Sequence, residues 1–105
     1  MGDITANTGY TVSEISVRRY NKVVFVKAFV TKTSGGFGTT QVSIAKMSNN
    51  ILPIQTTRFT CATGTYAYNA NHCAYGVVGT QGDISILTSN GSDTAVVFNF
   101  WYPIG

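Results

Sequence analysis

The chain has 105 residues and a formal net charge of +3 at pH 7, with 10% charged and 44% hydrophobic residues. An average soluble domain has roughly 25% charged residues. Uncharged polar side chains must therefore cover this surface, and the sequence supplies 15 threonines. The hydrophobic content excludes a disordered chain, and the low charge does not suit a helical cytosolic enzyme. The composition is typical of a β-rich extracellular or virion surface protein.

Residues 1–9 form a short polar segment that lacks the basic and apolar regions of a signal peptide. We expect this segment to be a linker or a few residues added before the domain. Residues 10–105 are expected to form one β-sandwich domain, which could be the C-terminal piece of a longer chain. No run of about 18 apolar residues occurs, so we expect no membrane insertion.

Short apolar segments separated by turn residues follow one another along the chain, which indicates an antiparallel all-β sandwich. The expected strands are 11–19, 23–33, 41–47, 54–62, 66–78, 83–87 and 94–102. For 41–47 a short helix through Lys46 fits the residues as well as a strand does.

Turn residues mark most of the boundaries. Asn21 tolerates a left-handed backbone and predicts a tight turn at 20–22. The glycine-rich loop at 34–38 carries Phe37 in a position that looks exposed. Gln81-Gly82 predicts a further turn, and Ser89-Asn90-Gly91-Ser92 is the strongest hairpin signal in the chain.

The basic residues do not indicate a nucleic-acid site, which would need denser positive charge interleaved with stacking aromatics. We expect them on solvated strand edges, where lysine also discourages unwanted strand pairing. Five of the seven lie in the first third of the chain: Arg18, Arg19, Lys22, Lys27 and Lys32.

The last strand, 94–102, is apolar on both faces, because successive side chains of a strand point to opposite sides. Strand 23–33 repeats this pattern, with one face uniformly apolar and the other interrupted by Lys27, as Asn99 interrupts the last strand. We assign the uniform faces to the core and the interrupted faces to a contact between subunits, with a second copy of the same chain as the leading candidate partner. A β-bulge that exchanges the faces is the alternative. The interface candidates are Val23, Phe25, Phe29, Val97, Asn99 and Trp101.

Cys61 and Cys73 are the only cysteines. They could form a disulfide in an oxidising compartment, but we favour two free thiols. Two cysteines are too few for a structural zinc site.

The sequence gives little support to catalysis, and we expect neither an enzyme nor a cofactor. His72 is the only histidine, and its neighbour Cys73 would point to the opposite face of a strand. The four acidic residues form no pair suited to acid–base chemistry, and no phosphate-binding motif occurs. We expect no metal site.

A polar, aromatic run differs from the aliphatic strands and is the better candidate for ligand binding. Tyrosine with asparagine offers an apolar face together with hydrogen-bond donors and acceptors, which suits glycans or proteins. Plain packing at the rim of a strand is the alternative. The ligand-binding candidates are Tyr66, Tyr68, Asn69, Asn71, His72, Tyr75 and, separately, Phe37.

The order of these signals resembles the C-terminal receptor-binding or tip domains of phage tail-fibre and baseplate proteins, many of which prophages of Gram-positive bacteria encode. The resemblance spans Tyr10 to Tyr102. It is carried by SVRRYNKVVFVKAFVT, the glycine-rich loop after it, ILPIQTTRF, GDISILT and VVFNFWY.

The resemblance implies a jelly-roll-like head that trimerises and attaches the particle to a bacterial cell-surface saccharide or protein. The protein would then lie in the virion tail, or in the bacterial cytoplasm while a prophage assembles. This chain lacks the His-x-His pairs that bind metal along the axis of some fibre tips. The alternatives are a trimeric jelly roll similar to the C1q and tumour-necrosis-factor group and a monomeric carbohydrate-binding module.

Overall fold

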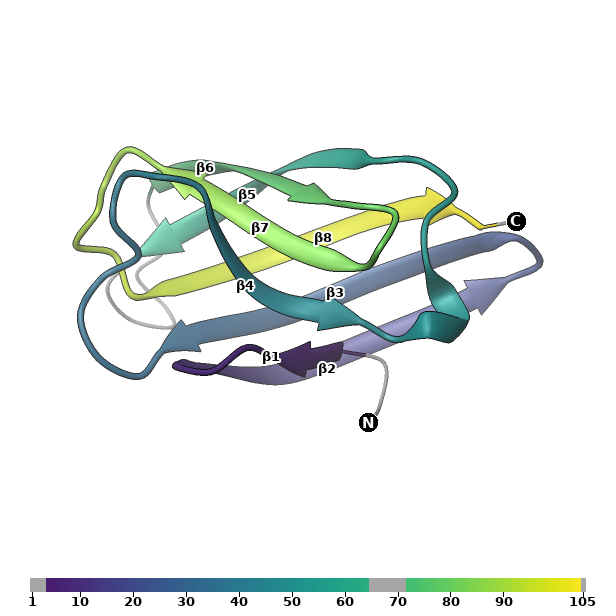
Figure 1. Ribbon diagram of the computed structural model, residues 1–105, viewed down its shortest axis with the longest axis horizontal. Helices are drawn as coiled ribbons and strands as arrows, with labels where there is room; N and C mark the ends of the chain where they lie inside the picture. Colours follow the sequence, from purple (N-terminus) through teal and green to yellow (C-terminus); the bar gives the residue numbers. More distant parts are fainter. Residues whose placement is uncertain (1–3, 65–71, 105) are drawn as a thin grey trace.

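The computed structural model describes residues 4–64 and 72–104, which form eight β-strands and one short 3-10 helix (Figure 1). The elements are β1 (Ile4–Ala6), β2 (Tyr10–Tyr20), β3 (Val23–Lys32), β4 (Val42–Met47), η1 (Asn49–Ile51), β5 (Thr57–Gly64), β6 (His72–Val78), β7 (Asp83–Thr88) and β8 (Ala95–Pro103).

All eight strands belong to one antiparallel sheet in the order β1-β4-β7-β6-β5-β8-β3-β2. The sheet curls until its two end strands, β1 and β2, lie against each other (Figure 1). The result is a flattened form between a barrel and a sandwich, with β4, β6 and β7 facing β2, β3 and β8. The predicted all-β antiparallel class is confirmed.

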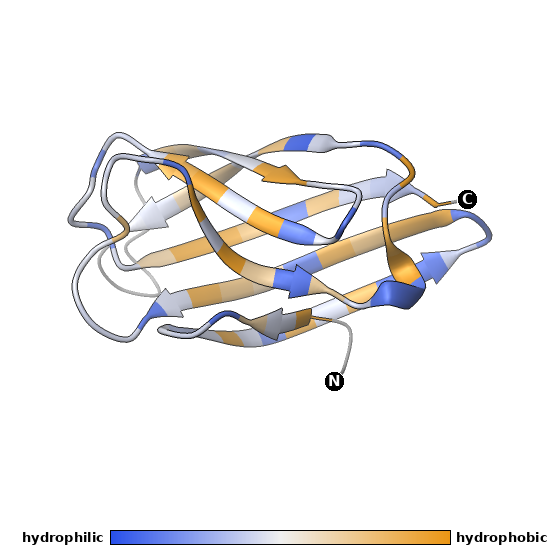
Figure 2. Ribbon diagram, in the orientation of Figure 1, coloured by the Kyte–Doolittle hydropathy of each residue, from blue (hydrophilic) through white to orange (hydrophobic). Residues whose placement is uncertain are grey.

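The core lies between these two layers. The order of hydrophobic and polar residues along each strand explains which side chains enter the core. Hydrophobic residues alternate with polar ones along β7 and run almost without interruption along β3 (Figure 2). The uniform faces assigned to the core are buried: Val24, Val26, Ala28 and Val30 on β3, and Val96, Phe98, Phe100 and Tyr102 on β8.

β3 and β8 pair in unbroken register from Val23 opposite Pro103 to Thr31 opposite Ala95. The alternative of a face-exchanging bulge in these strands is therefore wrong. The register irregularities lie elsewhere, in β2 between Ser13 and Ser16 and in β4 between Ser43 and Ala45.

The expected linker over residues 1–9 contains a strand. Residues 4–6 form β1, which pairs with β4 and places Ile4 opposite Met47, where its side chain is buried. A three-residue strand is too short to give a periodic signal. The segment also looks polar in the sequence, because the polar residues Thr5 and Asn7 alternate with Ile4 and Ala6.

The hairpin expected at residues 89–92 is also wrong, although a turn forms there. The Asp93 amide donates to the Asn90 carbonyl over 3.0 Å. The strands on either side do not pair, since β7 lies between β4 and β6 whereas β8 lies between β3 and β5. The connection instead crosses the end of the molecule, where the Gly91 carbonyl accepts from the Gly38 amide over 3.0 Å.

Phe37 is buried, contrary to the expected exposed position, with 4% of its surface accessible. Its amide donates to the Asp93 carbonyl over 2.9 Å, and its ring lies nearly parallel to that of Tyr10 at 6.2 Å. The glycines around Phe37 let the loop fold back over the open end of the core. Gly36 in particular meets the backbone of Gly91 and Ser92 at distances that leave no room for a Cβ atom.

The remaining local predictions hold with shifted boundaries. Asn21 has φ 54° in the predicted turn, and residues 42–47 form a strand rather than a helix. β5 begins at Thr57, three residues after the expected start, because η1 and Pro53 lead the chain irregularly into it. Part of the expected strand 66–78 lies outside the described residues.

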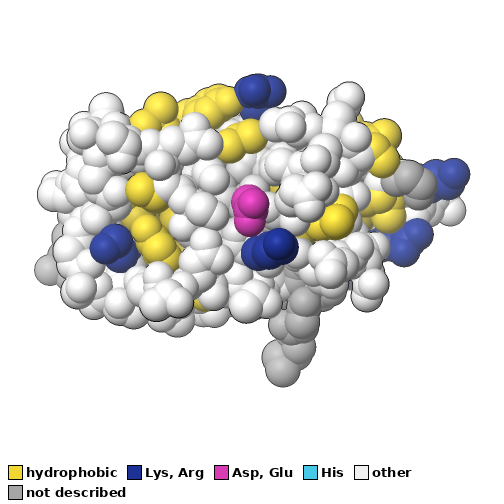
Figure 3. All heavy atoms as spheres, in the orientation of Figure 1, with side chains coloured by type: hydrophobic (Ala, Val, Ile, Leu, Met, Phe, Trp, Pro, Cys, Tyr) yellow, Lys and Arg dark blue, Asp and Glu magenta, His cyan; other side chains and the backbone are white. Residues whose placement is uncertain are grey.

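The surface carries few charges. On the face seen in Figure 3, acidic and basic side chains are scattered among uncharged polar groups and small apolar areas. No helix in the described part of the chain is long and apolar enough to cross a membrane.

Cys61 and Cys73 are free thiols, as favoured from the sequence. Cys61 pairs with Ala74 and Cys73 with Ala62, so the two side chains point to opposite faces of the sheet and cannot bond. Burial, with a smaller contribution from Cys73, raises the pKa of the Cys61 thiol to about 12.

We therefore expect the two thiols to be alkylated at very different rates. Iodoacetamide at pH 8 should alkylate Cys73 within minutes, whereas Cys61 should react only in urea, because a buried, protonated thiol is a poor nucleophile. Peptide mass spectrometry identifies the alkylated residue. Equal rates at both cysteines in the folded protein would contradict the placement of Cys61 in the core.

Candidate functional site

A cleft opens where β5 and β8 separate. The two strands pair only at one end, where Ala62–Gly64 lie opposite Val97–Ala95. They diverge from there toward the C-terminus (Figure 1). At the far end the Ile54 amide donates to the Pro103 carbonyl over 3.3 Å. The cleft is thus a gap in the wall of the sheet, closed at both ends by main-chain hydrogen bonds.

Stacked aromatic rings form the floor of the cleft. The rings of Phe59 from β5 and Phe100 from β8 lie 4.2 Å apart at an interplanar angle of 17°. Phe98 and Tyr102 extend this stack, at 5.5 and 6.0 Å from Phe100. The separated strands are therefore held together by ring contacts in place of a ladder.

Gly76 makes room for the floor. It lies opposite Phe59 on β6, and a Cβ atom at this position would stand 2.2 Å from the Phe59 ring. The ring therefore lies directly over the glycine backbone, as aromatic side chains often do beside a glycine in a sheet.

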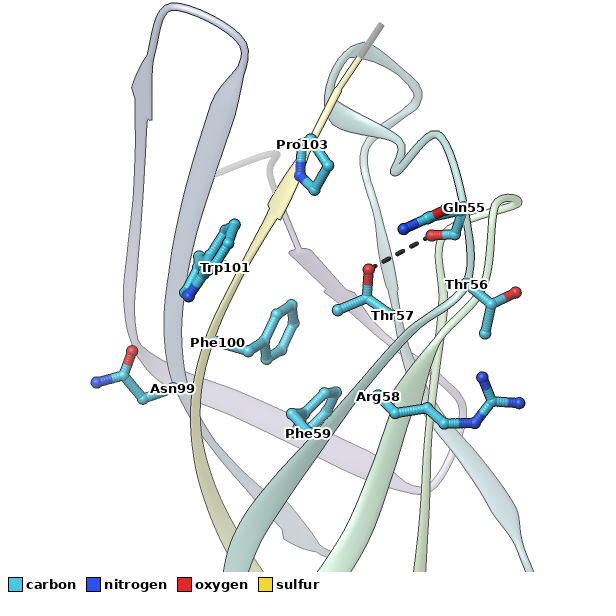
Figure 4. A pocket seen from close by; sticks show the side chains of 9 residues that line it. All are labelled: Gln55, Thr56, Thr57, Arg58, Phe59, Asn99, Phe100, Trp101 and Pro103. Carbon is cyan, nitrogen blue, oxygen red and sulfur yellow. Dashed lines mark hydrogen bonds between the residues drawn. The ribbon is translucent and has the colours of Figure 1, made fainter.

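Polar groups and one indole ring surround the floor. The cleft has a volume of about 490 Å³ and is lined by Gln55, Thr56, Thr57, Arg58, Phe59, Asn99, Phe100, Trp101 and Pro103. Figure 4 shows the two phenylalanine rings between the strands, with Trp101 and Asn99 on the β8 side and the threonines on the β5 side. The Thr57 hydroxyl donates to the Gln55 carbonyl over 3.4 Å.

Arg58 is the charged residue of this lining, and its side chain is turned away from the floor (Figure 4). Its Nε donates to the Tyr75 hydroxyl over 2.6 Å, on the neighbouring strand β6. The guanidinium is thus held beside the cleft rather than in it.

The six interface candidates lie beside the cleft, on the outer faces of β3 and β8. Phe25 is opposite Trp101, Lys27 opposite Asn99, and Phe29 opposite Val97. Phe25 and Trp101 are 44% and 60% exposed, and the Tyr20 ring meets that of Phe25 edge-on at 5.9 Å. We call Tyr20, Phe25 and Trp101 the outer aromatic row. It leaves a contiguous apolar surface uncovered on this chain.

The ligand-binding candidates from the sequence do not converge on the cleft. Tyr66, Tyr68, Asn69 and Asn71 lie outside the described residues. Tyr75 lies beside the cleft through its bond to Arg58, whereas His72 lies at the start of β6, next to Thr63 of β5. Phe37 is in the core and is no longer a candidate.

Sequence reasoning missed Gln55, Thr57 and Phe59, and no local pattern could have shown them. They belong to a segment that reads as an ordinary connection and strand. Their meeting with β8 depends on where that strand lies in the sheet. Trp101 and Asn99 were singled out, but for a subunit contact.

His72 belongs to a buried polar cluster at the opposite end of the β5–β8 pair. Its Nδ1 lies 2.8 Å from a carboxylate oxygen of Asp93, which also accepts from the Thr63 hydroxyl over 2.8 Å. The Thr63 and Thr88 hydroxyls are 3.5 Å apart. Asp93 is 1% exposed, so these partners compensate for its loss of water.

This cluster connects several strand ends. It ties the ends of β5, β6 and β7 to the segment that leads into β8. No group of three or more metal-ligating side chains occurs within residues 4–64 and 72–104.

No protein-family model matches the chain, and no curated protein matches it. Among solved structures, the head domain of the lactococcal phage bIL170 matches with a TM-score of 0.74 at 12% sequence identity. The likeness covers 98% of this chain and 96% of that one. The chain has the fold of a phage receptor-binding head. The fold expected from the resemblance is thereby confirmed.

The buried cluster of this head fold predicts a large effect of replacing its carboxylate. Asp93→Ala should lower the free energy of unfolding by about 2 kcal/mol, because the Thr63 hydroxyl and the His72 ring lose their shared acceptor. Urea unfolding followed by circular dichroism measures the change. The control, Asp83→Ala, removes an exposed carboxylate and should change stability by less than about 0.5 kcal/mol. Equal effects of the two substitutions would contradict a stabilising role for the cluster.

Proposed function

We propose that this chain is the non-enzymatic receptor-binding head of a phage tail fibre or baseplate, which attaches the particle to a bacterial cell-surface saccharide or protein. The observation that carries the proposal is the likeness to the phage bIL170 head, whose shared fold covers nearly the whole of both chains. A shared hairpin or half-sheet would give far less support, because such pieces recur in unrelated β proteins.

The chemistry of the cleft agrees with binding rather than turnover. Its lining residues, all of them described, include no histidine, cysteine or carboxylate, so they offer neither a general base nor a strong nucleophile. They instead combine aromatic surface with amide and hydroxyl groups, which orient a ligand in a small-molecule site.

The proposal places the protein in the virion tail and, before release, in the bacterial cytoplasm where the prophage is assembled. A threonine-rich surface with few charges suits a protein that works outside the cell.

The proposal includes a homotrimer built on the outer faces of β3 and β8. A monomeric soluble protein rarely leaves a large contiguous apolar patch in water. The partly buried Val23 adjoins the outer aromatic row, and the partly buried pair Phe29–Val97 lies beyond the exposed pair Lys27–Asn99 on the same outer faces. A second and third copy would cover this surface around a closed symmetry axis.

Adsorption to cells tests the receptor-binding role. The fluorescently labelled protein should bind a subset of strains in a panel of lactococci and other Gram-positive bacteria, because receptors differ between strains. Binding should saturate and be displaced by excess unlabelled protein. Flow cytometry measures it, and uniform or non-displaceable adsorption to every strain would refute the proposal, as would adsorption to none.

A charge in the apolar patch tests the assembly. Phe25→Glu should dissociate the oligomer to a folded chain of 11.3 kDa, because burying a carboxylate in the contact carries a desolvation cost that pairing with Arg18, its neighbour across the β2–β3 ladder, does not repay. Light scattering gives the mass, and circular dichroism reports the fold. The control Leu87→Glu, on β7 away from the patch, should leave the oligomer intact. A monomeric wild type, or an oligomeric Phe25→Glu variant at micromolar concentration, would exclude this interface.

A further inference from the structure

We propose that the cleft between β5 and β8 binds an uncharged saccharide ring, with the Phe59–Phe100 pair as its floor and Trp101 at its rim. The inference rests on the proposed receptor-binding function and names the ligand class and the residues of its site.

The first argument is that the cleft is preformed. Main-chain contacts close it at Ala62–Val97 and at Ile54–Pro103, and the stack of Phe59 on Phe100 fills the gap between. Its volume of about 490 Å³ lies within the range of roughly 300–1,000 Å³ that is usual for small-molecule sites. A rigid site of this size binds a compact ligand without the entropic cost of ordering a loop.

The second argument is the kind of surface that the cleft presents. A sugar ring has faces of C–H groups and a rim of hydroxyls that both donate and accept hydrogen bonds. The aromatic floor and the Trp101 indole match the C–H faces. The Gln55 and Asn99 amides and the Thr57 hydroxyl each carry donors and acceptors, which match the rim.

The exposure of Trp101 supports this role. An indole ring that remains 60% exposed gains little from packing within the chain. Its neighbour across the ladder, Phe25, belongs to the proposed subunit contact, whereas Trp101 also borders the cleft. The ring is therefore placed to lie against a ligand at the edge of that contact.

The third argument concerns charge. Arg58 is the charged residue of the lining, and its Nε is engaged with the Tyr75 hydroxyl at 2.6 Å, away from the floor (Figure 4). No lining residue carries a negative charge. Apart from Arg58, which points away, the floor and walls carry no charge and therefore match a ligand whose polarity comes from hydroxyl groups rather than from ionised groups.

The shape of the cleft favours a saccharide over a protein receptor. A stable protein contact buries about 800 Å² on each partner, and the extended apolar surface of this chain lies on the outer aromatic row. The cleft is a depression of about 490 Å³ with polar walls, which matches a ring or a short glycan chain better than a protein surface.

Trp101 is the only tryptophan, so its emission reports directly on the cleft. We would titrate the protein with glucose, galactose, rhamnose and N-acetylglucosamine, and with wall polysaccharide released from a strain that adsorbs the protein. At least one of these sugars should give a saturable change in emission and protect Trp101 from acrylamide quenching. No response to any of them would overturn the inference.

Variants on the side of the cleft away from the subunit contact locate the site. Gln55→Ala should weaken binding about threefold to tenfold, the effect of one lost hydrogen bond. Gly76→Val should abolish binding, because its side chain would displace the Phe59 ring from the floor. Both leave Trp101 in place as the reporter. The control Leu87→Ala, outside the cleft, should bind like the wild type.

The unfolding curve and the oligomeric mass of each variant show whether a loss of binding comes from the site or from the fold. Gln55 is exposed and outside the core, so its variant should keep the wild-type unfolding curve and oligomeric mass. If Gly76→Val does not fold, Gln55→Ala and Thr57→Val still test the polar walls of the cleft. Unchanged affinity in both wall variants would overturn the assignment of the site.

Treated cells distinguish failure of this inference from failure of the proposed function. Periodate, which cleaves vicinal diols, should abolish adsorption, whereas protease treatment and 0.5 M NaCl should not. Adsorption that survives periodate but not protease leaves the receptor-binding role intact and overturns the saccharide. Adsorption lost in salt overturns the uncharged ligand. Adsorption to no strain overturns the proposed function, and the titrations with free sugars then decide the cleft alone.

Discussion

The unbroken pairing of β3 with β8 is the constraint on which the rest of the structure depends. Both strands are apolar on both faces, and their register from Val23–Pro103 to Thr31–Ala95 aligns the two uniform faces on one side. A chain of 105 residues can bury that side only by curling the sheet until β4, β6 and β7 cover it. The same register aligns the interrupted faces on the outside, where no element within residues 4–64 and 72–104 covers them. The core and the exposed apolar patch thus have one cause.

The cleft follows from the same pairing. Since β8 keeps full register with β3, its other edge can follow β5 only over Ala62–Gly64 before the twist of the sheet separates the two strands. The gap is stabilised by rings instead of a ladder, and the flat stack of Phe59 on Phe100 requires a glycine at position 76. The Tyr102 hydroxyl, which donates to the Ile51 carbonyl over 2.6 Å, ties the connection before β5 to β8. The floor of the cleft is therefore a by-product of core packing.

Local periodicity was sufficient to predict the longer strands β3 and β8 and their faces, because alternation is a property of the strand itself, whereas β1 is too short to show it. It was not sufficient to predict which strands are neighbours. Asn90-Gly91 satisfies the chemistry of a tight turn, yet the strands it joins lie apart in the sheet. Phe37 looks exposed between glycines, yet those glycines let its loop close over the core. Nothing in the sequence marked Gln55, Thr57 and Phe59 as residues of a cleft, because the cleft exists only through the separation of two strands that are distant in sequence.

The residues around the cleft differ in how much they also contribute to the core and to the outer aromatic row. Phe59 and Phe100 serve the core and the floor together, so replacing either one alters stability as well as the site. Trp101 borders the cleft and belongs to the outer aromatic row, so a substitution there would affect the proposed ligand contact and the proposed subunit contact at once. Gln55 and Thr56, by contrast, are exposed residues of a connection and add nothing to the core. In the proposed saccharide site, ligand preference can therefore be altered through this connection at little cost in stability, while the floor stays the same.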